Sequence, residues 1–189
     1  MKLPVIAYGD PVLRKPAKEI DSSYPDLNKL IEDMFETMYH ANGVGIAAPQ
    51  VGKSIRLFVI DASPYAEDEP ALKDFKKVFI NPQIEEEIGE EWAYNEGCLS
   101  IPDIHEEVYR QEEVVLSYYD EHWQQHTEKF KGLAARVIQH EYDHIEGKLF
   151  TDKLPALRKV LLKSKLDAIS KGKVQVDYKM KFPVLKKRR

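Results

Sequence analysis

The sequence predicts an α+β fold in which antiparallel sheets pack around a central helix carrying the pattern HExxH, with an amphipathic helix near the N-terminus and another helix near the C-terminus. Runs rich in β-branched and aromatic residues and stretches with helical spacing occupy separate parts of the chain, which is typical of α+β proteins. The 189 residues are enough for one hydrophobic core and short for two. We therefore expect one domain over residues 1–189, in which residues 153–189 form a basic C-terminal helix and tail.

The first helix is expected over residues 24–41, where apolar side chains recur three and four positions apart. Ser23 ahead of Pro25 is typical of a helix start, with an N-cap followed by an early proline. Gly43 and Gly45 break the pattern and end the helix. The apolar stripe consists of Leu27, Leu30, Ile31, Met34, Phe35 and Met38.

The expected strands are β-rich runs bounded by turn residues. An acidic loop with two prolines, residues 61–76, separates the first two runs. Asp120-Glu121-His122 joins the next two as an antiparallel hairpin. The last run alternates apolar and polar residues, as a closing strand would. The five runs cover residues 55–60, 78–80, 107–119, 123–130 and 174–182.

Two more helices are expected in the C-terminal third of the chain. From Leu133, helical spacing continues through His140 and His144 to residue 147, a glycine that is a natural C-terminal stop. A further helix begins at Pro155. The HExxH pattern therefore lies on the helix that directly follows the hairpin, where the sheet can enclose it.

The composition is typical of a soluble globular protein, with 43% hydrophobic and 32% charged residues. The longest apolar runs fall well below the ~20 residues that cross a membrane. The N-terminus has neither a secretory signal pattern nor an organellar one. We expect a cytoplasmic protein without membrane contact, and the sequence leaves its oligomeric state open.

Charge is distributed unevenly along the chain. Residues 153–189 contain 13 Lys or Arg against 2 Asp or Glu, although the whole chain has a net charge of −4. The C-terminal segment is therefore basic and the preceding part acidic. A basic end closing with Lys186-Lys187-Arg188-Arg189 is often just a solvated terminus, but it also favours contact with a polyanion such as RNA.

His140, Glu141 and His144 form the first chemical signal. Residues four apart lie on the same face of a helix, about 6 Å apart along its axis, so the two imidazoles can converge on one cation. Glu141 can then reach a water on that cation and accept its proton. Hydrolysis of an amide-like bond requires this arrangement. A surface helix with solvated side chains is the alternative interpretation.

Cys98 is the best candidate for a third ligand. No histidine follows His144, Glu146 lies too close on the same helix, and His122 and His126 fall among polar residues of the hairpin. A thiolate beside two imidazoles leaves one position open for water, which is typical of a catalytic site. Ligand softness and tetrahedral geometry favour Zn²⁺. A buried structural thiol is the alternative for this single cysteine.

Three motifs resemble those of peptide deformylase. Residues 43–50, GVGIAAPQ, are similar to the family's GxGxAAxQ, residues 96–100 to EGCLS, and residues 139–147, QHEYDHIEG, to QHExDHxxG. They occur in the family's order, and residues 10–14, DPVLR, resemble its N-terminal stretch. The resemblance covers about residues 3–165, and the three motifs together are highly specific.

The resemblance implies an enzyme that hydrolyses the N-formyl group from the N-terminal formylmethionine of newly synthesised polypeptides and releases formate. N-formylmethionyl nascent peptides are then its substrates. Cys98, His140 and His144 would hold the metal. The resemblance implies Fe²⁺ as the physiological ion, with Zn²⁺, Ni²⁺ or Co²⁺ able to substitute, whereas ligand chemistry alone favours Zn²⁺.

The resemblance also assigns the catalytic roles. Glu141 would be the general base and then the proton donor to the leaving amine. The side-chain amide of Gln50 and the backbone N–H of Leu99 would bind the oxyanion, and such preorganised donors are effective at this task. A nascent chain as substrate also agrees with a basic tail that docks on ribosomal RNA, so the ribosome is a candidate partner.

Four residues are expected to bind the substrate. Backbone groups around Val44 and Gly45 would pair with the peptide as a strand does, a mode that suits many sequences. Val44, Ile101 and Val137 would line the pocket for the methionine side chain, although Val137 also suits a plain helix core.

Some positions depart from the family pattern. His105 stands where many members have an arginine near the substrate's path, Arg136 where an apolar residue is common, and Ile145 where leucine is common. These departures concern the pocket rather than the chemistry.

Three other functions remain as alternatives. A zinc peptidase of another family would need the HExxH residues but neither Cys98 nor the motif at residues 43–50. A metal-stabilised structural module would need a fourth protein ligand, and the sequence offers no evident one. A deformylase-like protein without activity is disfavoured by the intact Gln50, Cys98 and Glu141.

Overall fold

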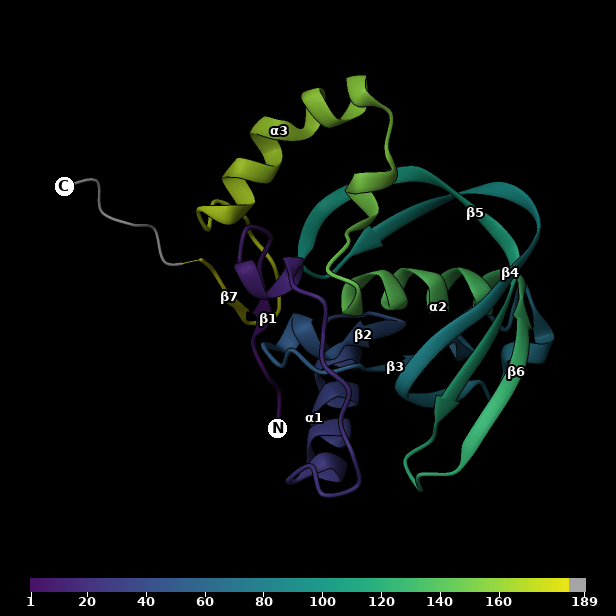
Figure 1. Cartoon of the computed structure of the whole chain (residues 1–189). Helices are drawn as coiled ribbons and strands as arrows, with labels where there is room; N and C mark the ends of the chain where they lie inside the picture. Colours follow the sequence, from purple (N-terminus) through teal and green to yellow (C-terminus); the bar gives the residue numbers. More distant parts are fainter. Residues whose placement is uncertain (184–189) are drawn as a thin grey trace.

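The computed structural model describes residues 1–183, which form three α-helices and two β-sheets (Figure 1). The helices are α1 (Leu27–His40), α2 (Gly132–Ile145) and α3 (Ala156–Ser170). The strands are β1 (Val5–Ile6), β2 (Gly45–Ala47), β3 (Leu57–Asp61), β4 (Lys76–Cys98), β5 (Ile101–Tyr119), β6 (Gln125–Lys131) and β7 (Met180–Lys181). Helices and antiparallel strands occupy separate parts of the chain, so the predicted α+β class is confirmed.

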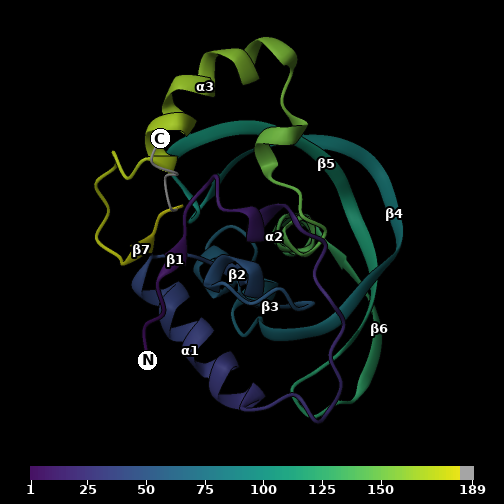
Figure 2. The ribbon, with the colours of Figure 1, turned by 60° about the vertical axis from the view of Figure 1, so that its left-hand side comes forward.

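A five-stranded antiparallel sheet, in the order β2-β3-β4-β5-β6, wraps around α2. Figure 2 views this helix nearly along its axis, with the ribbons of β4, β5 and β6 curving around it. The pairing of β4 with β5 shifts register at four places, and such bulges bend and twist a sheet. The HExxH helix is therefore central, as the sequence predicts.

The N-terminal and C-terminal segments meet in a second, two-stranded sheet. β1 and β7 pair in parallel, with Val5 opposite Met180. The backbone N–H groups of Val5 and Ala7 donate to the carbonyls of Lys179 and Lys181 at 2.8 and 2.9 Å. In Figure 2 this small sheet lies between α1 and α3. The chain that follows α3 is thereby tied back to the body of the protein.

Strand β3 is buried on both faces, which explains its continuous apolar run. Successive side chains of a strand point to opposite faces, so Phe58 and Ile60 pack in the cluster around α2, and Leu57 and Val59 in the cluster around α1. The predicted α1 stripe lies in the second cluster. Burying one side chain such as Phe58 contributes about 1.5–3 kcal/mol. These contacts fix β2 and β3 between the two helices.

The start of α1 differs from the prediction. The helix begins at Leu27 rather than near Pro25, and Ser23 does not cap it. The backbone N–H and the hydroxyl of Ser23 instead donate to Asp21 Oδ1 at 2.8 and 2.5 Å. Asp26 precedes the helix in the left-handed region, with φ 54°. A local aspartate turn therefore competes with the serine cap and delays the helix.

Two strand predictions are wrong in extent. β4 has 23 residues, whereas the sequence predicts residues 78–80 alone, because Asn81-Pro82 is typical of a turn. Glu85, Glu86 and Glu87 follow on the same strand. Those acidic side chains lie exposed on the bulged strand. The predicted strand at 174–182 reduces to the two residues of β7. The predicted hairpin is confirmed by β5 and β6.

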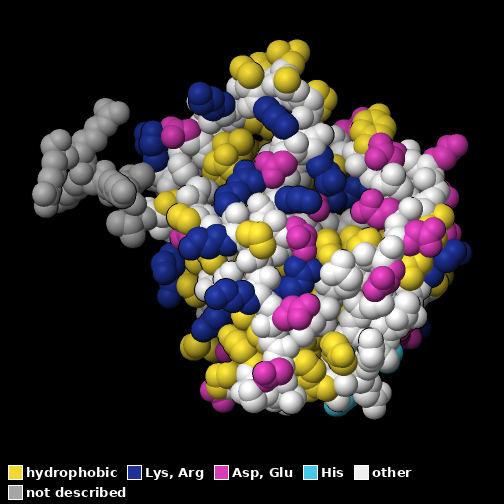
Figure 3. Space-filling view, in the orientation of Figure 1, with side chains coloured by type: hydrophobic (Ala, Val, Ile, Leu, Met, Phe, Trp, Pro, Cys, Tyr) yellow, Lys and Arg dark blue, Asp and Glu magenta, His cyan; other side chains and the backbone are white. Residues whose placement is uncertain are grey.

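The outer face of α3 combines basic and apolar side chains (Figure 3). Leu157, Val160 and Leu161 are 70%, 69% and 58% exposed, among exposed Lys and Arg residues of the same helix. Among residues 1–183, no helix is long and apolar enough to span a bilayer. The basic end predicted at residues 186–189 lies outside the described residues.

Candidate metal centre and active site

Cys98, His140 and His144 converge although they come from two different elements. The histidines project from α2 with ring centroids 5.1 Å apart, and Cys98 ends β4. Cys98 Sγ lies 3.3 Å from His144 Nε2, and one potential ligand atom from each residue lies within 4.8 Å of the others. Within residues 1–183, no other group of three such side chains is arranged to hold a metal ion. The structure thus brings together the three predicted ligands.

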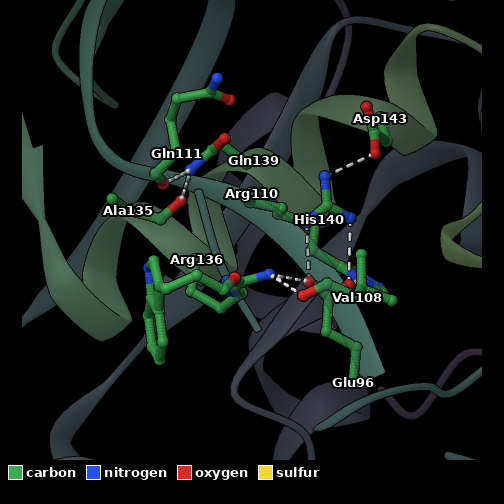
Figure 4. Close-up of polar contacts among 10 residues, drawn as sticks. Glu96, Val108, Arg110, Gln111, Ala135, Arg136, Gln139, His140 and Asp143 are labelled. Carbon is green, nitrogen blue, oxygen red and sulfur yellow. Dashed lines mark hydrogen bonds and ion pairs between the residues drawn. The ribbon is translucent and has the colours of Figure 1, made fainter. Parts of the chain in front are cut away.

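Glu96 orients the first histidine (Figure 4). Its Oε2 lies 2.9 Å from His140 Nδ1, which directs the other ring nitrogen toward Cys98. The carboxylate also accepts hydrogen bonds from Arg110 Nε and Nη2 at 2.6 and 3.0 Å, and from Arg136 Nη1 at 2.9 Å. Burial alone would raise the pKa of Glu96, but the hydrogen bonds from His140 and Arg110 hold that pKa well below its usual range.

The two arginines link β4, β5 and α2 inside the protein. Both guanidinium groups are 2% exposed. Arg110 reaches Asp143 on α2 at 2.8 Å. Arg136 donates to the carbonyls of Val108 and Trp92 at 2.9 and 2.6 Å, and its guanidinium lies 4.6 Å from the centre of the Trp92 ring. The arginine that departs from the family pattern is therefore part of a buried ion network.

Glu141 faces the same space as the three candidate ligands. Its side chain is buried, and Oε2 has no hydrogen-bond partner among residues 1–183. Burial raises the pKa of Glu141 to about 7. Gly45 on β2 provides the room, because a Cβ atom there would lie 2.6 Å from Glu141 Oε1. One carboxylate oxygen is thus free to exchange a proton.

Gln50 holds its side-chain amide in one orientation. Its Oε1 accepts a hydrogen bond from the Ala47 N–H at 2.9 Å, which leaves Nε2 as a donor on the side of the site. Nε2 lies 3.4 Å from Cys98 Sγ and 3.3 Å from Ser100 Oγ. Leu99 follows Cys98 at the tip of the β4–β5 hairpin. Both residues predicted to bind the oxyanion therefore border the cysteine.

A cavity of about 520 Å³ opens in front of these residues. Its wall includes all four residues predicted to bind substrate, namely Val44, Gly45, Ile101 and Val137. The sequence does not predict the contribution of residues 175–178 to the same wall. The wall also includes Tyr65, Tyr94, Arg136 and His105.

The other predicted histidines behave as the sequence indicates. His126 is held by Asp120, with 2.7 Å between Nε2 and Oδ2, and His122 is exposed. Glu146 pairs with Arg56 at 2.5 Å instead of joining the site. Sequence reasoning missed the contacts of Glu96 with Arg110 and Arg136, although Glu96 itself lies within the EGCLS motif.

The donor set fits a divalent transition metal, since one thiol and two imidazoles suit Zn²⁺ or Fe²⁺. Although burial lowers the pKa of His140, hydrogen bonds with Cys98 and Glu96 raise it well above its usual value, so His140 would release a proton when a metal binds. Burial, and then the charge of His140, lowers the pKa of His144 and keeps it in the neutral, metal-binding form. Fold and site together define an α+β hydrolase whose central HExxH helix carries a candidate metal centre.

Comparison with known proteins gives the family. A model of the polypeptide deformylase family matches residues 2–160. The chain is 62% identical to the peptide deformylase of Christiangramia forsetii and 56% identical to that of Flavobacterium johnsoniae, with all of each chain covered. A crystal structure of a peptide deformylase from Legionella pneumophila is 38% identical, covers 92% of this chain and 98% of that one, and superimposes with a TM-score of 0.79. A crystal structure of a peptide deformylase from Thermotoga maritima is 41% identical, covers 82% of this chain and 99% of that one, and superimposes with a TM-score of 0.74. The chain therefore belongs to the polypeptide deformylase family, whose members remove the N-formyl group from nascent peptides.

Proposed function

We propose that this protein hydrolyses the N-formyl group of the N-terminal formylmethionine of newly synthesised polypeptides and releases formate. The observation that carries the proposal is the convergence of Cys98, His140 and His144 beside the buried carboxylate of Glu141. A zinc peptidase of another family would need neither Cys98 nor the motif at residues 43–50. Because the substrates are nascent chains, we place the reaction in the cytoplasm.

The three converging residues would hold the metal, with Fe²⁺ as the ion in the cell and Zn²⁺, Ni²⁺ or Co²⁺ as substitutes. When bound, the cation supplies Lewis-acid polarisation of the formyl carbonyl and makes water more acidic. A thiol at the centre is sensitive to oxidation, so the enzyme should be handled without oxygen. Glu96 would keep His140 in the tautomer that presents its free nitrogen to the cation.

Glu141 would act first as general base and then as proton donor. Its unpartnered Oε2 can take a proton from the attacking water and deliver it to the nitrogen of the leaving amine. Gln50 Nε2 and the N–H of Leu99 would donate to the oxygen that becomes negative in the tetrahedral intermediate. Removing one such donor typically lowers kcat by about 10²–10³-fold. This division of roles assigns proton transfer and charge stabilisation to different residues.

The position of β2 at the edge of the large sheet supports strand-like substrate binding. A peptide beside Val44 and Gly45 could use main-chain hydrogen bonds, which suit substrates of many sequences. The methionine side chain would enter the apolar part of the cavity at Ile101 and Val137, which are 0% and 7% exposed. Val137 would then serve both the helix core and the pocket.

The test is an anaerobic assay of formate release from formyl-Met-Ala-Ser by the iron-loaded protein. We expect the wild type to release formate and Glu141→Ala to be slower by at least about 10²-fold. Glu146→Ala is the matched control, because this glutamate lies on the same chain segment but pairs with Arg56. No release from the wild type would overturn the proposed function. An active Glu141→Ala variant would overturn the role of Glu141.

We further propose that the basic C-terminal region, residues 153–189, contacts ribosomal RNA. Lys159 and Lys163 are exposed on α3 and, being four positions apart, lie on the same face of the helix. The charge-reversed variant Lys159→Glu/Lys163→Glu should co-sediment more weakly with ribosomes, and binding of the wild type should weaken with salt. Equal co-sedimentation of both proteins at all salt concentrations would exclude this contact.

A further inference from the structure

The chain that follows α3 returns to the active-site cavity. Residues 175–178 form part of the cavity wall, and β7 lies directly beyond them. The match to the family model ends at residue 160, so this part of the wall lies outside the region that defines the family. Figures 1 and 2 both show β7, which follows this segment, running beside β1. The wall is therefore completed by a part of the chain to which no role has been assigned.

Tyr178 binds the turn that carries Leu99. Its hydroxyl donates to the Leu99 carbonyl at 2.8 Å, and both side chains pack against the cluster around α1. The next carbonyl, that of Ser100, accepts a hydrogen bond from the Tyr8 N–H at 2.9 Å. Tyr8 follows β1 and Tyr178 precedes β7, so both donors come from segments next to the small parallel sheet. Two consecutive carbonyls of the turn are thus held by hydrogen bonds from these segments.

This turn has little freedom of its own. Cys98 pairs with Ile101, so the residues between them are Leu99 and Ser100 alone. The peptide groups that contain the Leu99 N–H and the Leu99 carbonyl share the Leu99 Cα, so a held carbonyl restrains one end of the peptide group that carries the N–H, and the pairing of Cys98 restrains the other end. Oxyanion donors act through preorganised geometry, and small displacements reduce their effect.

We infer that Tyr178 is a positioning residue for deformylation, because its hydrogen bond to the Leu99 carbonyl fixes the direction of the Leu99 N–H toward the oxyanion. This inference rests on the proposed function. The hydroxyl of Tyr178 donates to the backbone of the turn rather than to a predicted metal ligand or catalytic side chain. It would act through the backbone of the turn, and its loss should affect the transition state more than substrate binding.

The experiment compares Tyr178→Phe with Tyr118→Phe in the full chain, each loaded with metal to equal content. Both variants lose the hydrogen bond that the phenol donates, since Tyr118 donates to Glu128 Oε1 at 2.9 Å, away from the cavity. Tyr118→Phe also loses the longer contact from Lys77 Nζ at 3.4 Å, which makes it a demanding control. We expect Tyr178→Phe to lower kcat about three- to tenfold with an unchanged KM. Tyr118→Phe should leave both constants unchanged after correction for the folded fraction. Equal kcat values in the two variants would overturn the inference.

A second measurement is independent of activity. The backbone ¹⁵N resonance of Ser100 reports on the Leu99 carbonyl, because both atoms belong to one peptide group. It should shift in Tyr178→Phe and stay in place in Tyr118→Phe, and an unshifted resonance would overturn the inference. If the wild type were inactive but the Ser100 resonance shifted as expected in Tyr178→Phe, the proposed function would be overturned. The catalytic part of this inference would then be overturned with it.

Discussion

Replacing Glu96 with Gln should weaken the fold and the metal site together. The carboxylate accepts hydrogen bonds from Arg110 at 2.6 and 3.0 Å and from Arg136 at 2.9 Å, and it lies 2.9 Å from His140. Glutamine keeps the shape but loses the charge, so two guanidinium groups that are 2% exposed lose their shared counter-charge. Removing one partner of a buried ion pair costs about 3–5 kcal/mol. Arg110 keeps its ion pair with Asp143 at 2.8 Å, which compensates for part of the lost charge. We therefore expect the free energy of unfolding to fall by about 3 kcal/mol, the lower end of that range.

Urea denaturation of the metal-free protein measures this change without a contribution from the ion. Asp152→Asn is the matched control, since it makes the same chemical change at a pair with Arg14 whose side chains are 41% and 42% exposed. Solvent screens such a pair, and its loss should cost about 0–1 kcal/mol. Metal affinity, measured by competition with a chelator, should fall about 10–100-fold in Glu96→Gln alone, because His140 loses its orienting partner.

Two results would refute this reasoning. If Glu96→Gln were no less stable than Asp152→Asn, the buried network would not contribute to folding. If stability fell but metal affinity were that of the wild type, the contact with His140 would not orient the ligand.

Three further variants test the site. Gly45→Ala should lower kcat about tenfold or more, because its Cβ would lie 2.6 Å from Glu141 Oε1 and displace the base; wild-type kcat in a steady-state assay would contradict this. Gln50→Glu keeps an acceptor for the Ala47 N–H but loses the donor, so kcat should fall about 10²–10³-fold after correction for the folded fraction. Urea denaturation measures that fraction and should show a loss of stability, because residue 50 is 1% exposed and the variant buries a carboxylate there. Full activity would remove Gln50 from the oxyanion site. Zn²⁺ at 100 times its Kd should stabilise the wild type by about 2.7 kcal/mol and raise its Tm, and should do so much less in Cys98→Ser. Equal shifts in Tm would exclude Cys98 as a ligand.

The parts of the site that the sequence predicts are those encoded by short patterns. His140, Glu141 and His144 share one helix, so their spacing alone places them together. Cys98 lies 46 positions from His144, and its assignment depended on the chemistry of a missing ligand and on a family motif. The partners of Glu96 follow it by 14 and 40 positions in the chain, and no local pattern connects them.

The extent of β4 also depends on contacts between distant parts of the chain, which local patterns do not predict. Asn81-Pro82 is typical of a turn when read locally, but the strand continues past it through a register shift and pairs with β5 along most of its length. The segment before β7 shows the reverse case. Its alternating pattern predicts a strand, yet Tyr178 uses its side chain to bind the Leu99 carbonyl rather than its backbone to extend a sheet.

A buried ion network is weak evidence for stability, since well-packed hydrophobic residues often serve equally well. The network around Glu96 therefore needs another explanation, and its position provides one. Glu96 and Cys98 lie on the same strand, whereas His140 belongs to α2, so the three ligands stay together only if β4 keeps its position relative to the helix. The carboxylate holds His140 directly, and Arg110 and Arg136 tie the same strand to β5 and α2. A hydrophobic replacement could pack as tightly, but it could not fix the ring of His140 while holding the strand that carries Cys98.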